Sequence, residues 1–571
     1  MGNHFSMDIE NLKSCFEQIG DFKSWLYLGT WKNHHELFGV IKEYSGANYL
    51  FVISISKNFP NDKPEIFFLK GHSVFGDIPH LMPSDAICYV DEEGILIDED
   101  NPAGVIRDAF RKAFDTLVKS LKGESERDYV REFQFYWGGP GSIEMTSFVG
   151  DAKTPKLVQW LVAGDGRNFV FEDEQQSQLY LPKFDAVPDE SLTRQILYLP
   201  LSSSRGISFK DKWMIGTLRK VIFGNIGFKE RVNKFLRADS SLPVYITIPT
   251  ENSSRVHFAI SFENASGHKH PLLDKKCQSE IKPIIVKRMD KDYLLPRGGA
   301  RKEISNKKVC VIGCGAIGGI VAVELAKAGI SKLLLIDPDR FSEDNLYRHV
   351  LGMNDGIGQS KVDCLKKVIE SKLPHSIITA ISKRFDEAVD DGKIDFSEYD
   401  VVIDATGKPN VGFQIAHYFV SKHNKRLPVI HGWLEPFGIG GHAVVTNQKN
   451  GGCYKCLFRR TEEGSIYSGA SFAAPGQSFS KSMFGCVGMF TPFSSLDAMK
   501  SAVIIVEASV KVLLGQENNS QLLSWKGEAE DFLSQGFTLS NRYKNLTADE
   551  LFEKRYEFIN EHCPLCTKEM N

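Results

Sequence analysis

The sequence predicts an α/β protein built from three parts. From about residue 291 to the end, apolar strand-like runs alternate with helical segments, which is the pattern of a doubly wound parallel sheet. The first 125 or so residues mix strands and helices like an α+β domain, and the segment that follows carries many short β-rich runs. We therefore expect an α+β domain at 1–125, a β-rich connector at 126–290 and a sheet domain at 291–571.

The composition is that of a soluble globular protein. The chain has 571 residues, of which 42% are hydrophobic and 25% are charged, and this length suits about three domains. A formal net charge of -3 argues against direct binding to nucleic acid. We find no apolar run that could cross a membrane and no secretory leader. The 11 cysteines then predict a reducing, cytoplasmic location and metal or thiol chemistry rather than disulfides.

In the first part, the apolar patterns predict a helix at 7–19, strands at 25–27, 37–42 and 49–55, and a helix at 105–121. The connector contains the runs KLVQWLVA, QILYLPL and LPVYITIP, with few long helical patterns. No chemical motif stands out in the connector.

A glycine-rich turn lies between the strand VCVI and the helix IGGIVAVELAKAG. Gly313, Gly315 and Gly318 form the pattern G-x-G-x-x-G, and Asp337 ends the next apolar run. Glycines at this spacing let backbone N–H groups approach a phosphate at a helix N-terminus, and the acid suits a ribose. The motif by itself does not distinguish NAD, FAD and ATP.

The residues after Asp337 favour ATP. The segments DRFSEDNLYRHV and GIGQSKVDCLKK supply cations and amides that suit a triphosphate and that a hydride-transfer enzyme does not need. The strand YDVVID ends in Asp404, and a carboxylate there could hold Mg²⁺ across phosphate oxygens. Solvated loop charges explain any one of these residues, but they explain the ordered set poorly. The predicted nucleotide-binding residues are Gly313, Gly315, Gly318, Asp337, Asp339, Asn345, Arg348, Gln359, Lys361 and Asp404.

The order IDPDRFSEDNLYRHVL, GQSKV and DATGKPN resembles the ubiquitin-activating (E1-like) adenylyltransferases, including the ThiF/MoeB group, over roughly residues 295–571. The resemblance implies a Rossmann-like adenylation domain in which Asp337 binds the ribose and Asp404 binds magnesium. It also implies that the phosphates are contacted by Asn345, Arg348 and Lys361.

The reaction implied by the resemblance is attack of a protein C-terminal carboxylate on the α-phosphate of ATP. Members of this family are typically dimers in which an arginine reaches the nucleotide of the partner. Arg297 or Arg301, just before the first strand, could take that role in a homodimer.

Two C-x-x-C pairs, CYKC and CPLC, predict a metal site. Four thiolates at this spacing suit tetrahedral Zn²⁺, and a redox-active pair is the alternative. The long interval between the pairs matches a staple that ties the C-terminus to the sheet domain, as in many of these adenylyltransferases. The zinc ligands would be Cys453, Cys456, Cys563 and Cys566.

Cys486 lies in SMFGCVGMFTPFSS, a Gly- and Ser-rich loop that enters a long apolar helix. A loop beside a helix N-terminus could lower the pKa of a thiol and bring it to an acyl-adenylate. In the activating enzymes that form a thioester, most nearly the autophagy type, the catalytic cysteine can occupy this loop. A buried structural cysteine is the alternative. Packing explains Cys310, Cys314 and Cys364 better.

The segment NFPNDKPEIFFLKGHSVFGDIPHLMPSDAICYVDEEGILIDEDNPAGVIRDAFRKAF resembles a ubiquitin-conjugating (E2-like) domain. The resemblance implies that Cys88 carries a thioester, whereas the alternative is an ordinary core cysteine. The family's His-Pro-Asn reads His80-Leu81-Met82 here, so the asparagine that would stabilise the oxyanion is missing. We therefore expect that His80 is structural and that another group assists attack by a lysine.

The order of the three parts resembles the bacterial E2–E1 fusion proteins of antiphage CBASS operons. This resemblance implies that the C-terminus of a cGAS-like nucleotidyltransferase, or of a ubiquitin-like protein, passes from its adenylate to Cys486, then to Cys88, then to a lysine amine of a target. The implied cofactors are ATP, Mg²⁺ and a structural Zn²⁺.

Two other functions are open. A sulfur-carrier adenylyltransferase would share the ATP and zinc sites but would not need Cys88. A scaffold protein with an inactive N-terminal fold would keep ATP binding and form no thioester on Cys88.

Overall fold

The computed structural model divides into two compact units, Met1–Leu181 with Ala186–Asp290, and Pro182–Asp185 with Lys291–Asn571. The predicted boundary between residues 125 and 126 stays a prediction. The structure describes all residues except 1–6, 32–34, 76–77, 83, 91–96, 139–140, 206, 208–213, 252–253, 263–268, 278–279, 422–426, 448–450, 462–463, 485–486 and 567–571.

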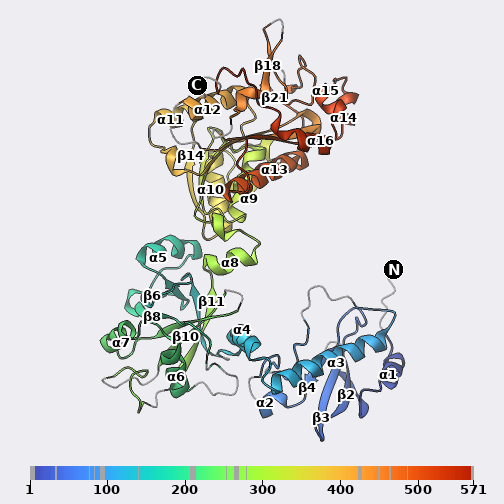
Figure 1. The fold of residues 1–571 in the computed structure, drawn as a ribbon, viewed down its shortest axis with the longest axis vertical. Coiled ribbons are helices and arrows are strands. Elements are labelled where there is room, and N and C mark those ends of the chain that lie inside the picture. The colour runs from blue at the N-terminus through green and yellow to red at the C-terminus, as the bar shows by residue number, and fades with distance from the viewer. Residues whose placement is uncertain are drawn as a thin grey trace. The chain divides into compact units, whose positions relative to one another are not determined.

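The N-terminal region is an antiparallel four-stranded sheet in the order β1-β2-β3-β4, with α3 lying across it (Figure 1). The amide oxygen of Asn101 accepts a hydrogen bond from Gly104 N–H at 3.0 Å and caps α3. Ile106, Phe110 and Leu117 recur at helical spacing and are buried in the core. The elements are α1 (Ile9–Glu17), β1 (Ser24–Trp31), β2 (His35–Tyr44), β3 (Ala47–Ile55), β4 (Glu65–Phe68), α2 (Gly71–Phe75) and α3 (Pro102–Leu121).

These elements confirm the predicted α+β region, with strands that run further than their most apolar residues. The additional strand residues have backbone pairing but little burial, as at the exposed ends of β1 and β2. The short helix α2 was not predicted.

The connector forms a closed barrel in the order β10-β11-β5-β7-β6-β8-β9. The β-rich prediction is confirmed, but closure was not predicted because the order pairs strands far apart in the sequence. The helix α4 packs on this barrel, where Trp137 at its end donates its indole N–H to the carbonyl of Ala259 at 3.1 Å. The strands are β5 (Ile143–Ser147), β6 (Lys156–Val162), β7 (Asn168–Phe171), β8 (Arg194–Pro200), β9 (Val244–Pro249), β10 (Arg255–Phe262) and β11 (Ile281–Arg288). The helices are α4 (Glu126–Tyr136), α5 (Glu174–Tyr180), α6 (Ile215–Asn225) and α7 (Lys229–Ala238).

The second unit contains a seven-stranded sheet in the order β14-β13-β12-β15-β16-β17-β22. The five strands from β14 to β16 are parallel, and β17 and β22 add antiparallel pairs. The sheet strands are β12 (Lys308–Ile312), β13 (Lys332–Ile336), β14 (Ile377–Ile381), β15 (Val401–Asp404), β16 (Val429–Leu434), β17 (Gly440–Thr446) and β22 (Gln521–Lys526). The short paired strands are β18 (Phe458–Arg460), β19 (Ile466–Ser468), β20 (Lys481–Phe484) and β21 (Val487–Phe490).

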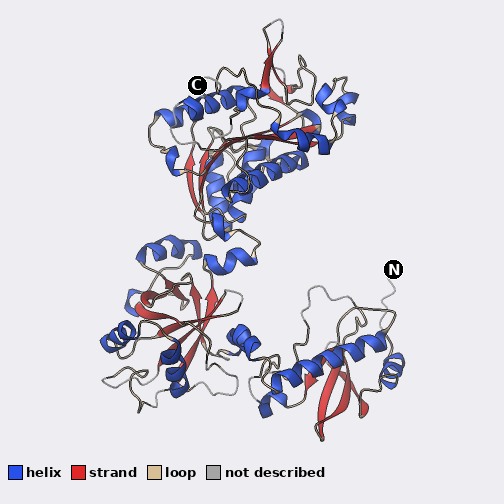
Figure 2. Cartoon of the chain, in the orientation of Figure 1, coloured by secondary structure: helices blue, strands red, loops and turns tan. Residues whose placement is uncertain are grey.

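Helices cover both faces of this sheet, which confirms the doubly wound prediction (Figure 2). On β12, Val309 and Val311 pack with α9, α10 and α13, whereas Cys310 and Ile312 pack with α11 and α12 on the other face. The helices are α8 (Lys291–Arg297), α9 (Ala316–Lys327), α10 (Lys361–Lys372), α11 (Phe385–Asp390), α12 (Pro409–Ser421), α13 (Ser495–Leu513), α14 (Glu530–Ser534), α15 (Asn541–Asn545) and α16 (Ala548–Glu553).

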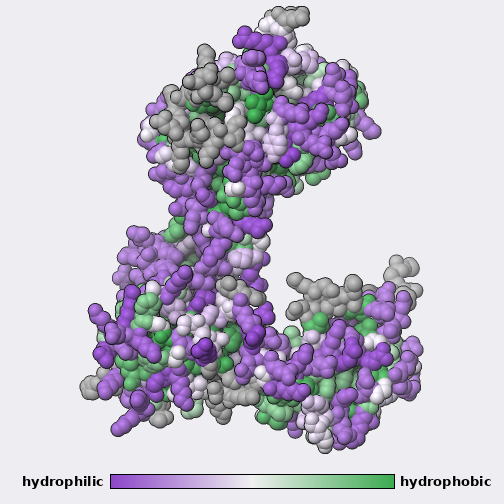
Figure 3. Space-filling model, viewed as in Figure 1, coloured by the Kyte–Doolittle hydropathy of each residue, from purple (hydrophilic) through white to green (hydrophobic). Residues whose placement is uncertain are grey.

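The face of the molecule drawn in Figure 3 is mostly hydrophilic, with smaller apolar patches. Within the described ranges, we find no helix with the length and apolar character needed to cross a membrane.

Candidate functional site

The glycine turn connects β12 to α9, and Gly313 and Gly318 are needed there for close approach, whereas a Cβ on Gly315 would meet nothing within 4 Å. Gly313 has φ +84°, and a Cβ on it would lie 2.7 Å from the backbone nitrogen of Thr406. A Cβ on Gly318 would lie 1.8 Å from the carbonyl oxygen of Gly313. Because these contacts leave no room for a side chain, only glycine lets the turn pack against the end of β15.

Asp337, at the end of β13, is buried and aimed at the glycine turn. One carboxylate oxygen accepts a hydrogen bond from Cys314 N–H at 2.6 Å, and the other accepts one from Asp339 N–H at 2.8 Å. The carboxylate therefore has a fixed orientation at the carboxyl ends of the parallel strands, where doubly wound sheets bind their ligands.

A pocket of about 470 Å³ opens at this place. Four of the predicted residues line it, namely Gly313, Gly315, Asp337 and Asp339. Lys383, Arg384 and Lys408 also line it and were not predicted. They follow the ends of β14 and β15, and that position at the carboxyl edge of the sheet is the sequence signal that could have found them.

The other predicted phosphate contacts lie outside this lining. Lys361 is buried and donates to the carboxylate of Asp339 at 3.0 Å. Asp339 lines the pocket, so Lys361 contacts a lining residue without lining the pocket itself. The side-chain oxygen of Asn345 accepts a hydrogen bond from Ser342 N–H at 3.2 Å. The side-chain oxygen of Gln359 accepts a hydrogen bond from Lys367 at 3.4 Å.

Arg348 lies against an aromatic ring, with its guanidinium carbon 5.7 Å from the ring centroid of Phe493. Arg297, one of the two arginines suggested for a dimer, lies 5.2 Å from the ring of Tyr293 in the same helix, α8. The backbone N–H of Arg301, the other one, donates to Ala328.

Asp404 ends β15 beside the pocket residues Ala405 and Thr406. One carboxylate oxygen accepts hydrogen bonds from the backbone N–H of Thr406 at 3.0 Å and from its hydroxyl at 2.7 Å. The other accepts a hydrogen bond from Nδ1 of His431 at 2.9 Å. The carboxylate is therefore held at both oxygens, and it retains acceptor capacity for a cation.

Cys88 is exposed, as a thiol that exchanges acyl groups must be. Its backbone N–H donates to the carbonyl of His80 at 2.8 Å. His80 has φ +65°, a left-handed conformation that costs about 1–3 kcal/mol for a non-glycine residue. The backbone at His80 is therefore held in an unfavourable conformation by its surroundings.

The imidazole of His80 is bound by the connector helix α4. Its Nδ1 lies 3.3 Å from the carboxylate of Glu132, and its Nε2 lies 3.4 Å from that of Asp128. Tyr136 donates its hydroxyl to the same Glu132 at 2.8 Å. These contacts hold the ring of His80 against α4, and its structural role stays a prediction.

The four predicted zinc ligands come together. Their sulfur atoms all lie within 4.8 Å of one another, with Cys453 and Cys563 at 3.6 Å and Cys456 and Cys566 at 3.5 Å. Tetrahedral zinc with bonds of about 2.3 Å places its sulfurs about 3.8 Å apart, so the cluster could bind zinc. Hydrogen bonds from Cys453 and Cys566 lower the pKa of Cys456, whereas the hydrogen bond with Cys456 raises the pKa of Cys453, so one thiol of the cluster loses its proton before the others.

Two known protein families match different parts of the chain. Residues 290–537 match the ThiF family, and residues 31–141 match Prokaryotic E2 family B. The chain joins a prokaryotic E2 domain to a ThiF domain. The glycine turn, Asp337 and Asp404 lie in the ThiF domain, and Cys88 lies in the E2 domain.

The chain is similar over most of its length to bacterial proteins. It is 24% identical to the ATP-dependent ubiquitin transferase-like protein Cap2 of Pseudomonas aeruginosa, over 76% of this chain and 79% of the relative. It is 23% identical to the protein of that name from Vibrio cholerae, over 83% of this chain and 88% of the relative. It is 30% identical to the adenylyltransferase and sulfurtransferase UBA4 of Scheffersomyces stipitis, over 33% of this chain and 41% of the relative.

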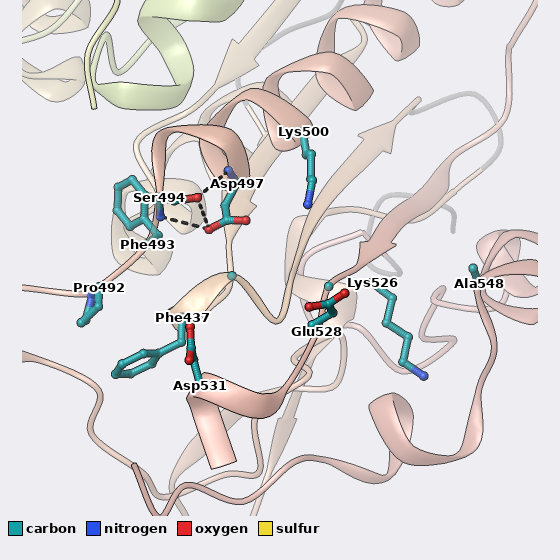
Figure 4. Close-up of a pocket in the computed structure, with 12 residues that line it drawn as sticks. Phe437, Pro492, Phe493, Ser494, Asp497, Lys500, Lys526, Glu528, Asp531 and Ala548 are labelled. Carbon is teal, nitrogen blue, oxygen red and sulfur yellow. Dashed lines mark hydrogen bonds between the residues drawn. The ribbon is translucent and has the colours of Figure 1, made fainter. Parts of the chain in front are cut away.

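The ThiF domain has a second pocket, of about 850 Å³, at the start of α13 (Figure 4). Ser494 caps this helix, and its hydroxyl donates to the carboxylate of Asp497 at 2.7 Å. The lining combines aromatic side chains with charges of both signs. It includes Phe437, Pro492, Phe493, Asp497, Lys500, Lys526, Glu528 and Asp531.

The predicted catalytic residue Cys486 of the ThiF domain lies outside the described residues. Cys310, Cys314 and Cys364 are buried, as expected for packing cysteines. Burial raises the pKa of the Cys314 thiol well above its usual range, so this cysteine is a poor nucleophile although it lies in the glycine turn.

Removal of metal is expected to destabilise the ThiF domain. We expect one zinc per chain in the wild type and none in Cys456→Ser, since three remaining thiolates bind zinc far more weakly. A loss of about 3 kcal/mol would lower the Tm by roughly 6 °C or more. Metal analysis and thermal unfolding check this, with Cys277→Ser in the connector as the control cysteine. Full zinc content in Cys456→Ser would contradict the four-cysteine site.

The contact between His80 and α4 is expected to depend on pH. The hydrogen bond with Glu132 raises the pKa of His80, so its stabilising contribution is present below about pH 6.5 and is lost as pH rises through the raised value. Burial alone would raise the pKa of Glu132, but the hydrogen bond with His80 lowers it overall, so this contribution is lost as pH falls through the lowered value.

Titration of His80 by NMR checks this prediction. In Glu132→Gln the pKa of His80 is expected to fall toward its ordinary value, whereas Glu126→Gln, an exposed change on the same helix, should leave it unchanged. Equal effects of the two substitutions would show that the charge of the helix, and not the specific contact, acts on His80.

Proposed function

We propose that this protein is an ATP-dependent conjugating enzyme that adenylates the C-terminus of a protein, carries it as a thioester and joins it to a target amine. The observation that carries the proposal is the presence on one chain of a ThiF domain with a pocket at its glycine turn and an E2 domain with an exposed cysteine. The names of the Cap2 relatives, which align over most of this chain, support it.

In the proposed first step, ATP binds in the pocket at the glycine turn. The backbone N–H groups at the start of α9 face the phosphates, and Asp337 accepts from the ribose. Lys408 adds positive charge at the pocket wall, where Arg384 is paired with Asp386 of the same wall. We place Asn345, Arg348, Gln359 and Lys361 on the phosphate side, as the sequence predicts.

Asp404 is the residue that would hold Mg²⁺, which would neutralise phosphate charge when bound. The C-terminal carboxylate of the donated protein attacks the α-phosphate, a P–O bond forms, and pyrophosphate leaves with the electrons of the broken bond. The thiolate of Cys486 then attacks the acyl carbon and AMP leaves.

Transfer to Cys88 and then to an amine completes the reaction. Each step exchanges one leaving group for one nucleophile, so the acyl group passes from sulfur to sulfur and finally to a lysine nitrogen. Joining both thiols to one chain raises their effective concentration, to roughly millimolar.

The donated protein is proposed to be a cGAS-like nucleotidyltransferase that is primed for antiphage defence, or a ubiquitin-like protein. The pocket in Figure 4 is the proposed place for its C-terminal segment, because two of its lining residues, Pro492 and Phe493, follow Cys486 closely in the sequence. Homodimerisation, with Arg297 or Arg301 reaching the partner's nucleotide, also belongs to this proposal.

A second candidate is an adenylyltransferase for a sulfur carrier. The similarity to the adenylyltransferase and sulfurtransferase UBA4 favours it, but that similarity covers only 33% of this chain. This function gives the E2 domain no role.

The test combines purified protein, ATP, Mg²⁺ and a candidate carrier protein with an intact C-terminus. Carrier-dependent exchange of pyrophosphate into ATP and a thiol-sensitive adduct on a non-reducing gel are expected. Exchange without any adduct would overturn the relay and favour the sulfur-carrier function. A carrier that lacks its last residues should support neither signal, and activity with it would contradict C-terminal activation.

A further inference from the structure

A buried chain of contacts joins Asp404 to the cysteine cluster. His431 lies on β16, and its Nδ1 donates to Asp404 at 2.9 Å. The imidazole stacks on the ring of Tyr454, with centroids 4.4 Å apart and planes inclined by 26°. Tyr454 directly follows Cys453 and lies in the short helix η9 (Tyr454–Leu457), which also carries Cys456. The exposed fractions of Asp404, His431 and Tyr454 are only 4%, 1% and 6%.

Two contacts orient the ring of His431, namely the hydrogen bond from Nδ1 to Asp404 and the stack on Tyr454. Nε2 is buried and has no hydrogen-bond partner among the residues that the structure describes. A buried histidine ordinarily uses both ring nitrogens, and a buried polar atom without a partner calls for a reason. Here the hydrogen bond to Asp404 and the stack on Tyr454 hold the imidazole in place.

The position of Asp404 makes this orientation matter for the pocket. Asp404 and His431 are direct partners in the register of β15 and β16, so the imidazole reaches the carboxylate from the neighbouring strand. The next residues, Ala405 and Thr406, line the pocket and pack against Gly313. A rotation of the Asp404 carboxylate would therefore change the pocket wall that faces the glycine turn.

The ring of Tyr454 is itself held by the fold. A Cβ on Gly412 would lie 2.5 Å from this ring, so glycine in α12 provides the space for it. Trp433 and Phe458 contact it edge to face, with centroids at 6.0 and 5.2 Å. The cysteines before and after Tyr454 in the C-x-x-C pair set where its backbone lies, and this position depends on the closure of the four-cysteine cluster.

We propose that His431 and Tyr454 are positioning residues for Asp404, through which the cysteine cluster orients the carboxylate of the nucleotide site. The four-cysteine site then does more than stabilise the fold, because its occupation by a metal tightens the binding of Mg·ATP. This inference rests on the proposed role of Asp404 in binding Mg²⁺.

The test uses paired substitutions in the full chain. His431→Phe keeps an aromatic ring for the stack but removes the donor to Asp404, whereas His431→Asn keeps a donor and removes the ring. Tyr454→Phe keeps the stack, and Tyr454→Leu removes it. Calorimetry gives the Kd for ATP with and without Mg²⁺, and metal analysis gives the zinc content of each variant.

We expect His431→Phe to raise the Kd of Mg·ATP roughly 10-fold or more, as changes to the partners of a metal ligand typically do. The Kd of ATP without Mg²⁺ should change much less. Tyr454→Phe should have the Kd values of the wild type. In Tyr454→Leu and in the zinc-free Cys456→Ser, the Kd of Mg·ATP should rise as in His431→Phe, and the Kd of ATP without Mg²⁺ should change much less.

Two results would overturn the inference alone. One is an unchanged Kd of Mg·ATP in His431→Phe with full zinc content. The other is an equal loss with and without Mg²⁺, together with a lower Tm, which would indicate a merely structural role. A wild-type protein that binds no ATP would overturn the proposed function, and the inference with it.

Discussion

Cys88→Ala is expected to abolish conjugate formation and to leave adenylation intact. The thiol is the proposed final carrier of the acyl group, and alanine offers no nucleophile. Because Cys88 is exposed, its truncation should change stability by no more than about 0.5 kcal/mol. Carrier-dependent pyrophosphate exchange should therefore stay within about twofold of the wild type.

A non-reducing gel with the carrier protein separates the two thiols. In Cys88→Ala, the adduct on Cys486 is expected to persist, whereas Cys486→Ala should lose both adducts because Cys88 is loaded from Cys486. Cys277→Ala, a half-buried cysteine of the connector, is the control and should conjugate normally. Normal conjugation by Cys88→Ala would contradict the two-thiol relay.

Gly313→Ala is expected to remove ATP binding. The new Cβ would lie 2.7 Å from the backbone nitrogen of Thr406, so the turn must move away from β15. If two backbone N–H groups at the start of α9 lose a phosphate, the cost is at least about 3 kcal/mol, since hydrogen bonds to charged groups contribute about 1.5–3 kcal/mol each. The affinity for ATP should fall by about 100-fold or more.

The control for Gly313→Ala is Gly536→Ala. The two glycines have nearly the same φ, +84° and +82°, but a Cβ on Gly536 meets nothing within 4 Å. Both variants carry the cost of a left-handed alanine, and only Gly313→Ala carries the collision. Calorimetry with ATP and thermal unfolding measure both effects. Equal affinities of the two variants would contradict a phosphate site at the turn.

The parts of the site that sequence analysis found are motifs whose residues lie close together in the sequence. The glycine turn and Asp337 lie at the ends of consecutive strands, and a hydrogen bond of 2.6 Å from Cys314 N–H to Asp337 joins them. The two C-x-x-C pairs likewise contain most of their metal geometry within four residues each, so only the meeting of the pairs depended on the fold.

Other functional contacts could not be found in this way. Lys383, Arg384 and Lys408 look like ordinary charges of loops, and only the strand order places them around one pocket. His80 is bound by two carboxylates of α4, a helix that begins more than 40 residues further along the chain. Hydrophobic periodicity predicts helices and strands, but it does not predict which helix a histidine in a loop will contact.

Sequence patterns were enough to predict the order of the domains, the doubly wound sheet, the glycine turn with its acid and the two pairs of cysteines. These features follow from hydrophobic periodicity and from backbone demands that only certain residues meet. Tertiary structure alone decided the closed barrel, the antiparallel strands β17 and β22, and the line from Asp404 through His431 to Tyr454. Such contacts arise when separate elements pack, and packing selects partners by shape and burial rather than by distance along the chain.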